Sequence, residues 1–160
     1  MPVDYRNPAA CVAVLIVRSG ELLLAKRGVE PMKGAWDTVG GFVDEHESAE
    51  EALVRETREE TGLEVGKIDY LGSVHDHYGL EQKPILHLCF LASVVDGNPV
   101  ARSDVASLAW FPLDELPDHM AFPNQSKVLG FLKARLAGAG PSSKVVDAKR
   151  SEQVEACRRS

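Results

Sequence analysis

Residues 40–63 read GGFVDEHESAEEALVRETREETGL, and this stretch decides the fold of the chain. It predicts a helix that begins after Ser48, because Ser48 and Glu51 have the spacing of a capping box, in which each side chain bonds the other residue's amide. Neither proline nor glycine interrupts the pattern until Gly62, which suits the end of a helix. The stretch therefore predicts a glycine-led loop and one long helix.

The predicted helix carries three carboxylates on one side. At about 100° of rotation per residue, Glu59 lies about 60° to one side of Glu56 and Glu60 about 40° to the other. Like charges one turn apart cost roughly a few tenths of a kcal/mol per pair, and the neighbouring arginines offset only part of this. A hard cation in front of the face explains the arrangement, because oxygen ligands suit Mg²⁺ or Mn²⁺ rather than zinc. For the three glutamates alone, an acidic solvated helix is the alternative.

The flanking residues predict a mixed sheet. The expected strands are Cys11–Arg18, Glu21–Lys26, Trp36–Val43, Ile68–Val74, Ile85–Val95 and Val105–Phe111. We expect the first two to form a hairpin and a polar loop with Tyr78 to precede the Ile85 strand. Gly40-Gly41 should break the third strand, at a point where the backbone either turns or approaches another segment closely. A second amphipathic helix is expected over Asn124–Leu136. These elements predict an α/β fold, with helices flanking a mixed β-sheet.

Composition limits the kinds of partner. The 160 residues are 44% hydrophobic and 26% charged, with a net charge of −6, which is typical of one globular domain. An acidic protein is not expected to bind nucleic acid, and it can bind an anionic substrate when a divalent cation stands between them. The longest apolar run, Ala9–Val17, is too short to span a membrane. Three cysteines without metal-ligand spacing suit a reducing compartment, so we expect a cytoplasmic protein.

The composition changes after the second predicted helix. From Ala137 onward Gly, Ala, Ser and Pro dominate, so we expect one domain over residues 1–136 and a polar tail, disordered or peripheral, over 137–160. The tail holds five Lys or Arg and three Asp or Glu, a net charge of +2. The total of −6 therefore leaves −8 for residues 1–136.

The full spacing of the central stretch resembles the Nudix box, the motif that defines the Nudix hydrolase superfamily. It reads Gly41-x5-Glu47-x7-Arg55-Glu56-x2-Glu59-Glu60-x-Gly62-Leu63. At average residue usage such a match arises by chance in on the order of one in a million chains of this length. Two positions depart from the family's pattern. Thr57 replaces a bulky aliphatic residue and Val39 replaces a frequent proline, and we expect both to change packing or stiffness rather than chemistry.

The likeness extends beyond the box over roughly residues 10–136. The similar segments are Glu21–Arg27, Gly34–Trp36, Trp110–Pro117 and Ala121–Pro123. The whole pattern looks most like the branch that handles ADP-ribose, NADH and related adenine dinucleotides. The resemblance implies the Nudix fold, an α/β/α sandwich around a mixed sheet. It also implies a Mg²⁺-dependent pyrophosphohydrolase that cuts a nucleoside diphosphate linked to another moiety.

The same resemblance implies roles for individual residues. Glu56 and Glu60 look like the main metal-binding carboxylates, with Glu59 as a direct or water-mediated ligand. Gly40 is similar to the glycine whose carbonyl reaches the metal, and Mn²⁺ is a substitute for Mg²⁺. Glu47 and Arg55 look like a supporting pair, in which Arg55 braces the loop and orients the glutamates.

The general base is left open, because relatives use either a box glutamate or an acid from a later loop. Asp104, just before the Val105–Phe111 strand, is the preferred loop candidate, and Glu81 and Asp76 are weaker ones. An ordinary surface acid is the alternative for each. The motif also leaves open whether the protein forms a homodimer, as many relatives do.

For several other residues, the sequence is consistent both with a functional role and with an ordinary structural role. His75 and His77 share a strand face, but no third zinc ligand is evident. Tyr78 or Phe122 could stack on a base, and Arg27 and Lys83 could meet phosphates. Packing and solvated charge are the ordinary roles of such residues.

The alternatives to hydrolysis of a linked nucleoside diphosphate are nucleotide binding without catalysis, (d)NTP sanitation, RNA cap removal and prenyl-diphosphate isomerisation. The binding module is disfavoured because every box glutamate is present, and cap removal because residues 1–136 are acidic.

Overall fold

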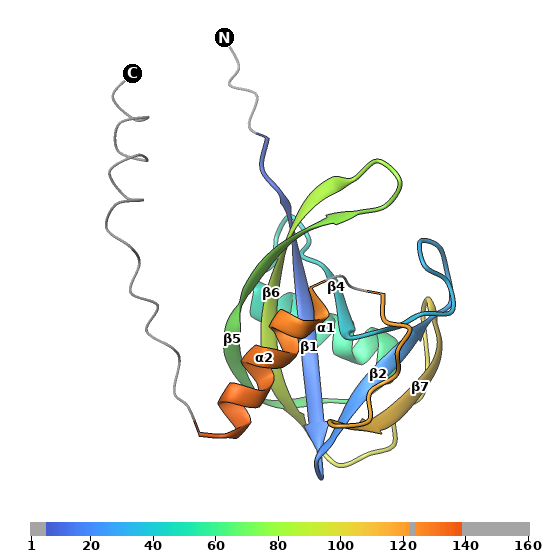
Figure 1. The fold of residues 1–160 in the computed structure, drawn as a ribbon, viewed down its shortest axis with the longest axis vertical. Helices are drawn as coiled ribbons and strands as arrows, with labels where there is room; N and C mark the ends of the chain where they lie inside the picture. The colour runs from blue at the N-terminus through green and yellow to red at the C-terminus, as the bar shows by residue number, and fades with distance from the viewer. Residues whose placement is uncertain (1–5, 122–123, 139–160) are drawn as a thin grey trace.

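A computed structural model describes residues 6–121 and 124–138 (Figure 1). The elements are β1 Ala9–Arg18, β2 Glu21–Arg27, β3 Trp36–Asp37, β4 Val39–Phe42, α1 Ala49–Thr61, β5 Val65–Tyr78, β6 Lys83–Val94, β7 Val105–Pro112 and α2 Gln125–Leu136. Phe122 and most of the predicted tail lie outside the described residues, so the base-stacking role of Phe122 and the domain limit at residue 136 stay predictions. None of the described helices is long and apolar enough to cross a membrane.

The strands form a mixed sheet with β1 at its centre. The strand order is β3-β2-β1-β6-β5, with β4 also paired to β1 and β7 to β2. β1 runs parallel to β6 and antiparallel to β4 and β2. The predicted hairpin of β1 and β2 forms only next to its turn, where Val17 pairs with Leu22 and Arg18 pairs with Glu21. The rest of β2 pairs with β7 and not with β1, so β1 and β2 diverge away from their turn.

β1 is buried on both of its faces. Its even-numbered side chains, Val12, Val14 and Ile16, pack in a core with Ala52 and Leu53 of α1. Its odd-numbered side chains, Ala13 and Leu15, pack in a second core. That core also contains Val128 and Leu132 of α2. A strand covered on both faces carries a continuous apolar run, which is the pattern of this part of the sequence. The two helices thus cover opposite faces of the sheet, and the predicted α/β/α sandwich is confirmed (Figure 1).

The limits of α1 follow the sequence pattern. Ser48 Oγ accepts from the Glu51 amide at 3.2 Å, and the Glu51 carboxylate accepts from the Ser48 amide at 2.7 Å, which completes the predicted capping box. Gly62 ends the helix at φ 71°, a left-handed conformation that glycine adopts without strain. Both ends of α1 are therefore fixed by residues within or next to the helix.

The predicted strand break at Gly40-Gly41 was wrong, but the close approach expected there is confirmed. The interruption falls at Thr38, between β3 and β4, and the two glycines lie inside β4, opposite Ala13 and Val12 of β1. Glycine is needed there for space, because a Cβ at Gly40 would collide with the Val12 carbonyl oxygen. The glycine pair marks a close approach of two backbones rather than the end of a strand.

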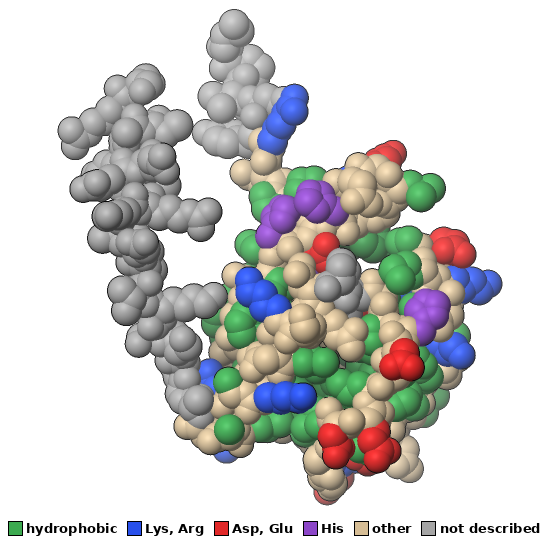
Figure 2. All heavy atoms as spheres, viewed as in Figure 1, with side chains coloured by type: hydrophobic (Ala, Val, Ile, Leu, Met, Phe, Trp, Pro, Cys, Tyr) green, Lys and Arg blue, Asp and Glu red, His purple; other side chains and the backbone are tan. Residues whose placement is uncertain are grey.

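The predicted polar loop around Tyr78 is mostly strand. β5 continues to Tyr78 and β6 begins at Lys83, so residues 75–77 pair with residues 84–86. Strand pairing uses backbone groups, and the polar side chains here are no obstacle because both faces of a projecting hairpin can be partly solvated. The result is a long β5–β6 hairpin, whose tip turns at Gly79–Gln82. Histidine side chains are exposed on the surface of this hairpin (Figure 2).

Candidate active site

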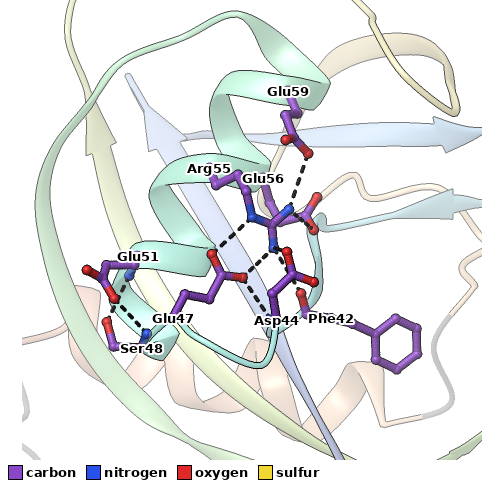
Figure 3. A network of polar contacts seen from close by, with 8 residues as sticks. All are labelled: Phe42, Asp44, Glu47, Ser48, Glu51, Arg55, Glu56 and Glu59. Carbon is purple, nitrogen blue, oxygen red and sulfur yellow. Dashed lines mark hydrogen bonds and ion pairs between the residues drawn. The ribbon is translucent and has the colours of Figure 1, made fainter.

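Arg55 lies at the centre of a polar network on the outer side of α1 (Figure 3). Its Nε donates to Glu47 Oε2 at 3.0 Å and its Nη2 to Glu47 Oε1 at 2.5 Å, a two-pronged ion pair. Nη2 also donates to the Phe42 carbonyl at 3.1 Å. Nη1 donates to Glu56 at 2.8 Å and to Glu59 at 3.2 Å. One guanidinium therefore ties the loop after β4 to two carboxylates of the helix, which is the bracing arrangement expected for Glu47 and Arg55.

The loop contributes its own bond to this brace. Glu47 Oε1 also accepts from the Asp44 amide at 2.9 Å. The hydrogen bonds from Arg55 and from Asp44 lower the pKa of Glu47 to about 2, since they stabilise its ionised form. Glu47 therefore stays ionised and bound to Arg55 at any pH near neutrality.

Glu60 points in the other direction, toward the sheet. Its side chain is buried, with the residue 8% exposed, and Oε2 accepts from the Gly40 amide at 3.1 Å. Burial raises the pKa of Glu60 to about 8, and the charges of Glu56, Asp104 and Asp37 add to the rise. This carboxylate therefore lies among other acids, and no ion pair to it is found in the described part of the chain.

Glu56 lies beside the glycine pair. A Cβ at Gly41 would collide with the Glu56 carboxylate, so the missing side chain makes room for it. Burial raises the pKa of Glu56, while the bond from Arg55 acts in the opposite direction. The glycine pair thus allows two partly buried carboxylates to approach the β4 backbone.

The donor set fits a hard divalent cation in kind. Glu56 and Glu60 offer oxygen ligands, and Mg²⁺ in proteins takes one or two carboxylates and completes its shell with water and substrate oxygens. Glu59 is 52% exposed at its side chain and bound to Arg55, so it lies at the rim. Among the residues described, no three His, Cys, Asp or Glu side chains are grouped so that they could coordinate a metal ion by themselves. The residues therefore fit a metal that shares its shell with solvent and substrate.

A small cleft beside Glu60 joins segments that are far apart in the sequence. Its lining includes Arg27, Asp37, Gly40, Glu60 and Asp104. Its volume of about 40 Å³ has room for about one or two waters but not for a nucleotide. Asp104, the preferred loop acid, is therefore brought to the same cleft as Glu60.

The pairing of Arg27 with Asp37 was not predicted. Arg27 Nη1 lies 3.3 Å from Asp37 Oδ2, and its Nε donates to the Pro31 carbonyl at 2.7 Å. Burial raises the pKa of Asp37, and the charge of Arg27 opposes that rise. The sequence shows only that Asp37 lies inside a short predicted strand. This position does not identify the basic residue with which it pairs.

Several other residues lie away from the cleft. Glu81 pairs with Lys83 at 3.0 Å near the tip of the β5–β6 hairpin, with both side chains exposed. Asp76 accepts from the His77 amide at 2.7 Å. The His75 and His77 rings pack edge to face at 5.0 Å. Tyr78 packs edge to face on Phe42, beside the bracing network.

Comparisons with known proteins identify the family of the chain. The model of the NUDIX domain matches residues 6–130. An ADP-ribose pyrophosphatase of Methanocaldococcus jannaschii is 32% identical over 130 residues, which are 81% of this chain and 76% of the relative. The NAD-capped RNA hydrolase NudC of Pseudomonas aeruginosa is 38% identical over 118 residues, or 71% of this chain. The chain spans only 40% of the length of that relative.

A solved structure gives the same answer for the fold. The MutT NUDIX hydrolase from Burkholderia pseudomallei superimposes with a TM-score of 0.72 at 30% identity, over 79% of this chain and 98% of that one. The sandwich fold and the family match over most of the chain together identify a hydrolase of the Nudix type. The chain belongs to the NUDIX domain family, and the predicted enzyme class, a Nudix hydrolase, is confirmed.

Proposed function

We propose that the protein hydrolyses the diphosphate linkage of a nucleoside diphosphate joined to another moiety, with Mg²⁺ as its cofactor and Mn²⁺ as a substitute. The observation that carries the proposal is the position of Glu56 and Glu60. Both carboxylates are partly or fully buried, and both have a raised pKa. Both also lie close to the β4 backbone, where Gly40 and Gly41 have no side chains. Such a site gains most from a cation, because the cation removes the cost of holding two like charges out of water.

Glu56 and Glu60 would hold the metal, with Glu59 and the carbonyl of Gly40 at its edge. Bound there, Mg²⁺ supplies charge neutralisation for the phosphoryl oxygens. Arg55 and Glu47 keep the helix and loop in register by the bonds described above. Asp104 takes the proton of the attacking water, whose oxygen bonds to phosphorus as the bridging P–O bond breaks. The products are a nucleoside monophosphate and a phosphorylated remainder.

The preferred substrates are ADP-ribose, NADH and related adenine dinucleotides. The ADP-ribose pyrophosphatase relative supports this choice, since its identity extends over most of both chains. The NudC relatives act on NAD-capped RNA, but this chain spans less than half of their length. The net charge of −8 over residues 1–136 favours a free dinucleotide over RNA, because RNA binding gains from basic surfaces.

We also infer a cytoplasmic location. Cys11 and Cys89 are both free and buried, which agrees with a reducing compartment. Whether two chains associate is measured directly by sedimentation of the purified protein.

The test is a substrate panel with mass-spectrometric readout of products. ADP-ribose, NADH, FAD, diadenosine polyphosphates and nucleoside triphosphates are each incubated with Mg²⁺, with Mn²⁺ and with a chelator. Cleavage of ADP-ribose or NADH to a nucleoside monophosphate, abolished by the chelator, is the expected result. Preferential release of pyrophosphate from a triphosphate would favour nucleotide sanitation instead. Tight binding without any cleavage would favour a binding module.

A further inference from the structure

The geometry points to residues 100–104 as a clasp between α1 and β2 that holds Asp104 over the acidic cleft, with Gly28 as its positioning residue. The inference rests on the proposed function, in which Asp104 accepts the proton of water. Asp104 is exposed and lies in a connection between strands, so its side chain is not placed by burial. Its place in the cleft must come from the backbone on either side of it.

One side of the clasp is bonded to the C-terminus of α1. The Val100 amide donates to the Thr61 carbonyl at 2.9 Å, and the Arg102 amide donates to the Glu60 carbonyl at 3.1 Å. The last carbonyls of a helix have no partner within it, so this loop satisfies two of them. Glu60 is therefore held twice, by Arg102 at its carbonyl and by Gly40 at its carboxylate.

The other side of the clasp is bonded to the residue after β2. The Gly28 amide donates to the Asp104 carbonyl at 2.8 Å. A Cβ at Gly28 would lie 2.6 Å from that oxygen and 3.3 Å from the Ala106 amide nitrogen. Both neighbours are backbone atoms, which cannot turn aside as a side chain can. Gly28 does not have a positive φ, so close approach alone requires glycine at this position.

A tight turn joins the two sides. Ser103 has φ 58°, and the Val105 amide donates to the Arg102 carbonyl at 3.2 Å. The backbone of Asp104 is thereby fixed from Gly28 on one side and from the end of α1 on the other. The same turn brings the acid to the cleft that Glu60 lines, and the charge of Asp104 contributes to the raised pKa of Glu60. The clasp thus couples the position of the loop acid to that of the metal-binding helix.

The coupling is tested by a double-mutant cycle of Gly28→Ala and Asp104→Asn. Steady-state kinetics are measured with Mg²⁺ and ADP-ribose, or with whichever diphosphate the panel finds to be cleaved. Asp104→Asn is expected to lower kcat on the order of 100-fold, the usual contribution of a general base. Gly28→Ala should lower kcat by a similar factor with little change in KM, and the double variant should be no slower than either single one.

Matched variants separate this effect from a general loss of structure. Gly130→Ala, in α2 with nothing within 4 Å of its added Cβ, should keep the original kcat. If Gly28→Ala does not fold, as judged by circular dichroism, Ser103→Val replaces it, because a β-branched residue is strained at a positive φ. Ser103→Gly, which accepts that conformation, should keep kcat.

Three results would overturn the clasp: an unchanged kcat in the folded Gly28→Ala variant, losses that multiply in the double variant, or an unchanged kcat in Asp104→Asn. The proposed function fails on a different observation, the absence of any diphosphate cleavage by the original protein.

Discussion

The two helices of the sandwich are held in place in different ways. α1 has a capping box at its start, a left-handed glycine at its end and an arginine that braces its outer face. α2 has no side-chain cap at Asn124, whose side-chain Nδ2 instead donates to the His75 carbonyl of β5 at 2.8 Å. Its other attachments are also tertiary, with Phe131 on Gly72 and Arg135 bonded to Asp69 and the Tyr70 carbonyl.

The difference teaches where precision is needed. Both helices bury an apolar side against β1, so both contribute to stability in the same manner. Of the two helices, only α1 supplies carboxylates to the site in the proposed function, and their positions must then be precise for the chemistry to proceed. We therefore expect changes on the polar side of α1 to alter turnover, and changes under α2 to alter stability alone.

The largest expected effect is that of Glu60→Gln on turnover. The change removes a carboxylate that we propose binds the metal, and we expect kcat to fall on the order of a thousandfold, equivalent to about 4 kcal/mol. Stability should not fall, because glutamine has the same shape and its side-chain oxygen can still accept from the Gly40 amide. Steady-state kinetics and thermal denaturation measure the two quantities, and Glu56→Gln serves as a parallel case. Near-normal turnover in both variants would mean that the site lies elsewhere.

The opposite pattern is expected for Leu132→Ala in α2. Leu132 is fully buried between α2 and the sheet, so its truncation should cost about 3 kcal/mol of unfolding free energy. Urea denaturation measures the loss. At a temperature where the variant remains folded, kcat should match that of the original protein. A large drop in kcat there would show that α2 shapes the site as well as the core.

The N-terminal caps of the two helices give a smaller contrast. Ser48→Ala removes the side-chain acceptor of the capping box and should destabilise the protein by about 1 kcal/mol. Asn124→Ala removes no cap bond, so it reports only on the bond to β5. Equal losses in urea denaturation would contradict the idea that α1 is the more locally specified helix.

The smallest expected effect has the opposite sign. Thr57 is completely buried on α1, and its hydroxyl has no hydrogen-bond partner within residues 6–121 and 124–138. Thr57→Val keeps the shape and removes the unsatisfied group, so we expect a gain of up to about 1 kcal/mol. Thr61→Val is the control, because the Thr61 hydroxyl bonds the Thr57 carbonyl at 2.5 Å and its loss should destabilise. A destabilised Thr57→Val variant would indicate an unseen partner for that hydroxyl.

The elements with local determinants could be predicted from the sequence. Ser48, Glu51 and Gly62 set the ends of α1 through bonds within four residues, so their pattern sufficed. The apolar run of β1 reported burial on both faces, which fits a sandwich. The pairing of Glu47 with Arg55 was expected from the Nudix likeness, and the helix places the two within bonding distance.

The remaining features depend on contacts between distant segments. A close approach at Gly40 and Gly41 was expected, but its partner, β1, could not be named because β1 is not adjacent in the sequence. The cleft joins Arg27, Asp37 and Asp104 from three separate segments, and no spacing rule links them. Asp104 could be named as an acid near a strand, but the bonds that hold its backbone could not be deduced before the fold was known.

The central position of β1 also has a consequence for how the molecule opens. Its side chains belong to both cores, so neither helix can detach fully without exposing the same strand. Amide protons in the middle of β1 should therefore exchange with solvent only through global unfolding, whereas those at the β5–β6 tip exchange through local fluctuations. Unfolding then occurs as a single cooperative event rather than one layer at a time.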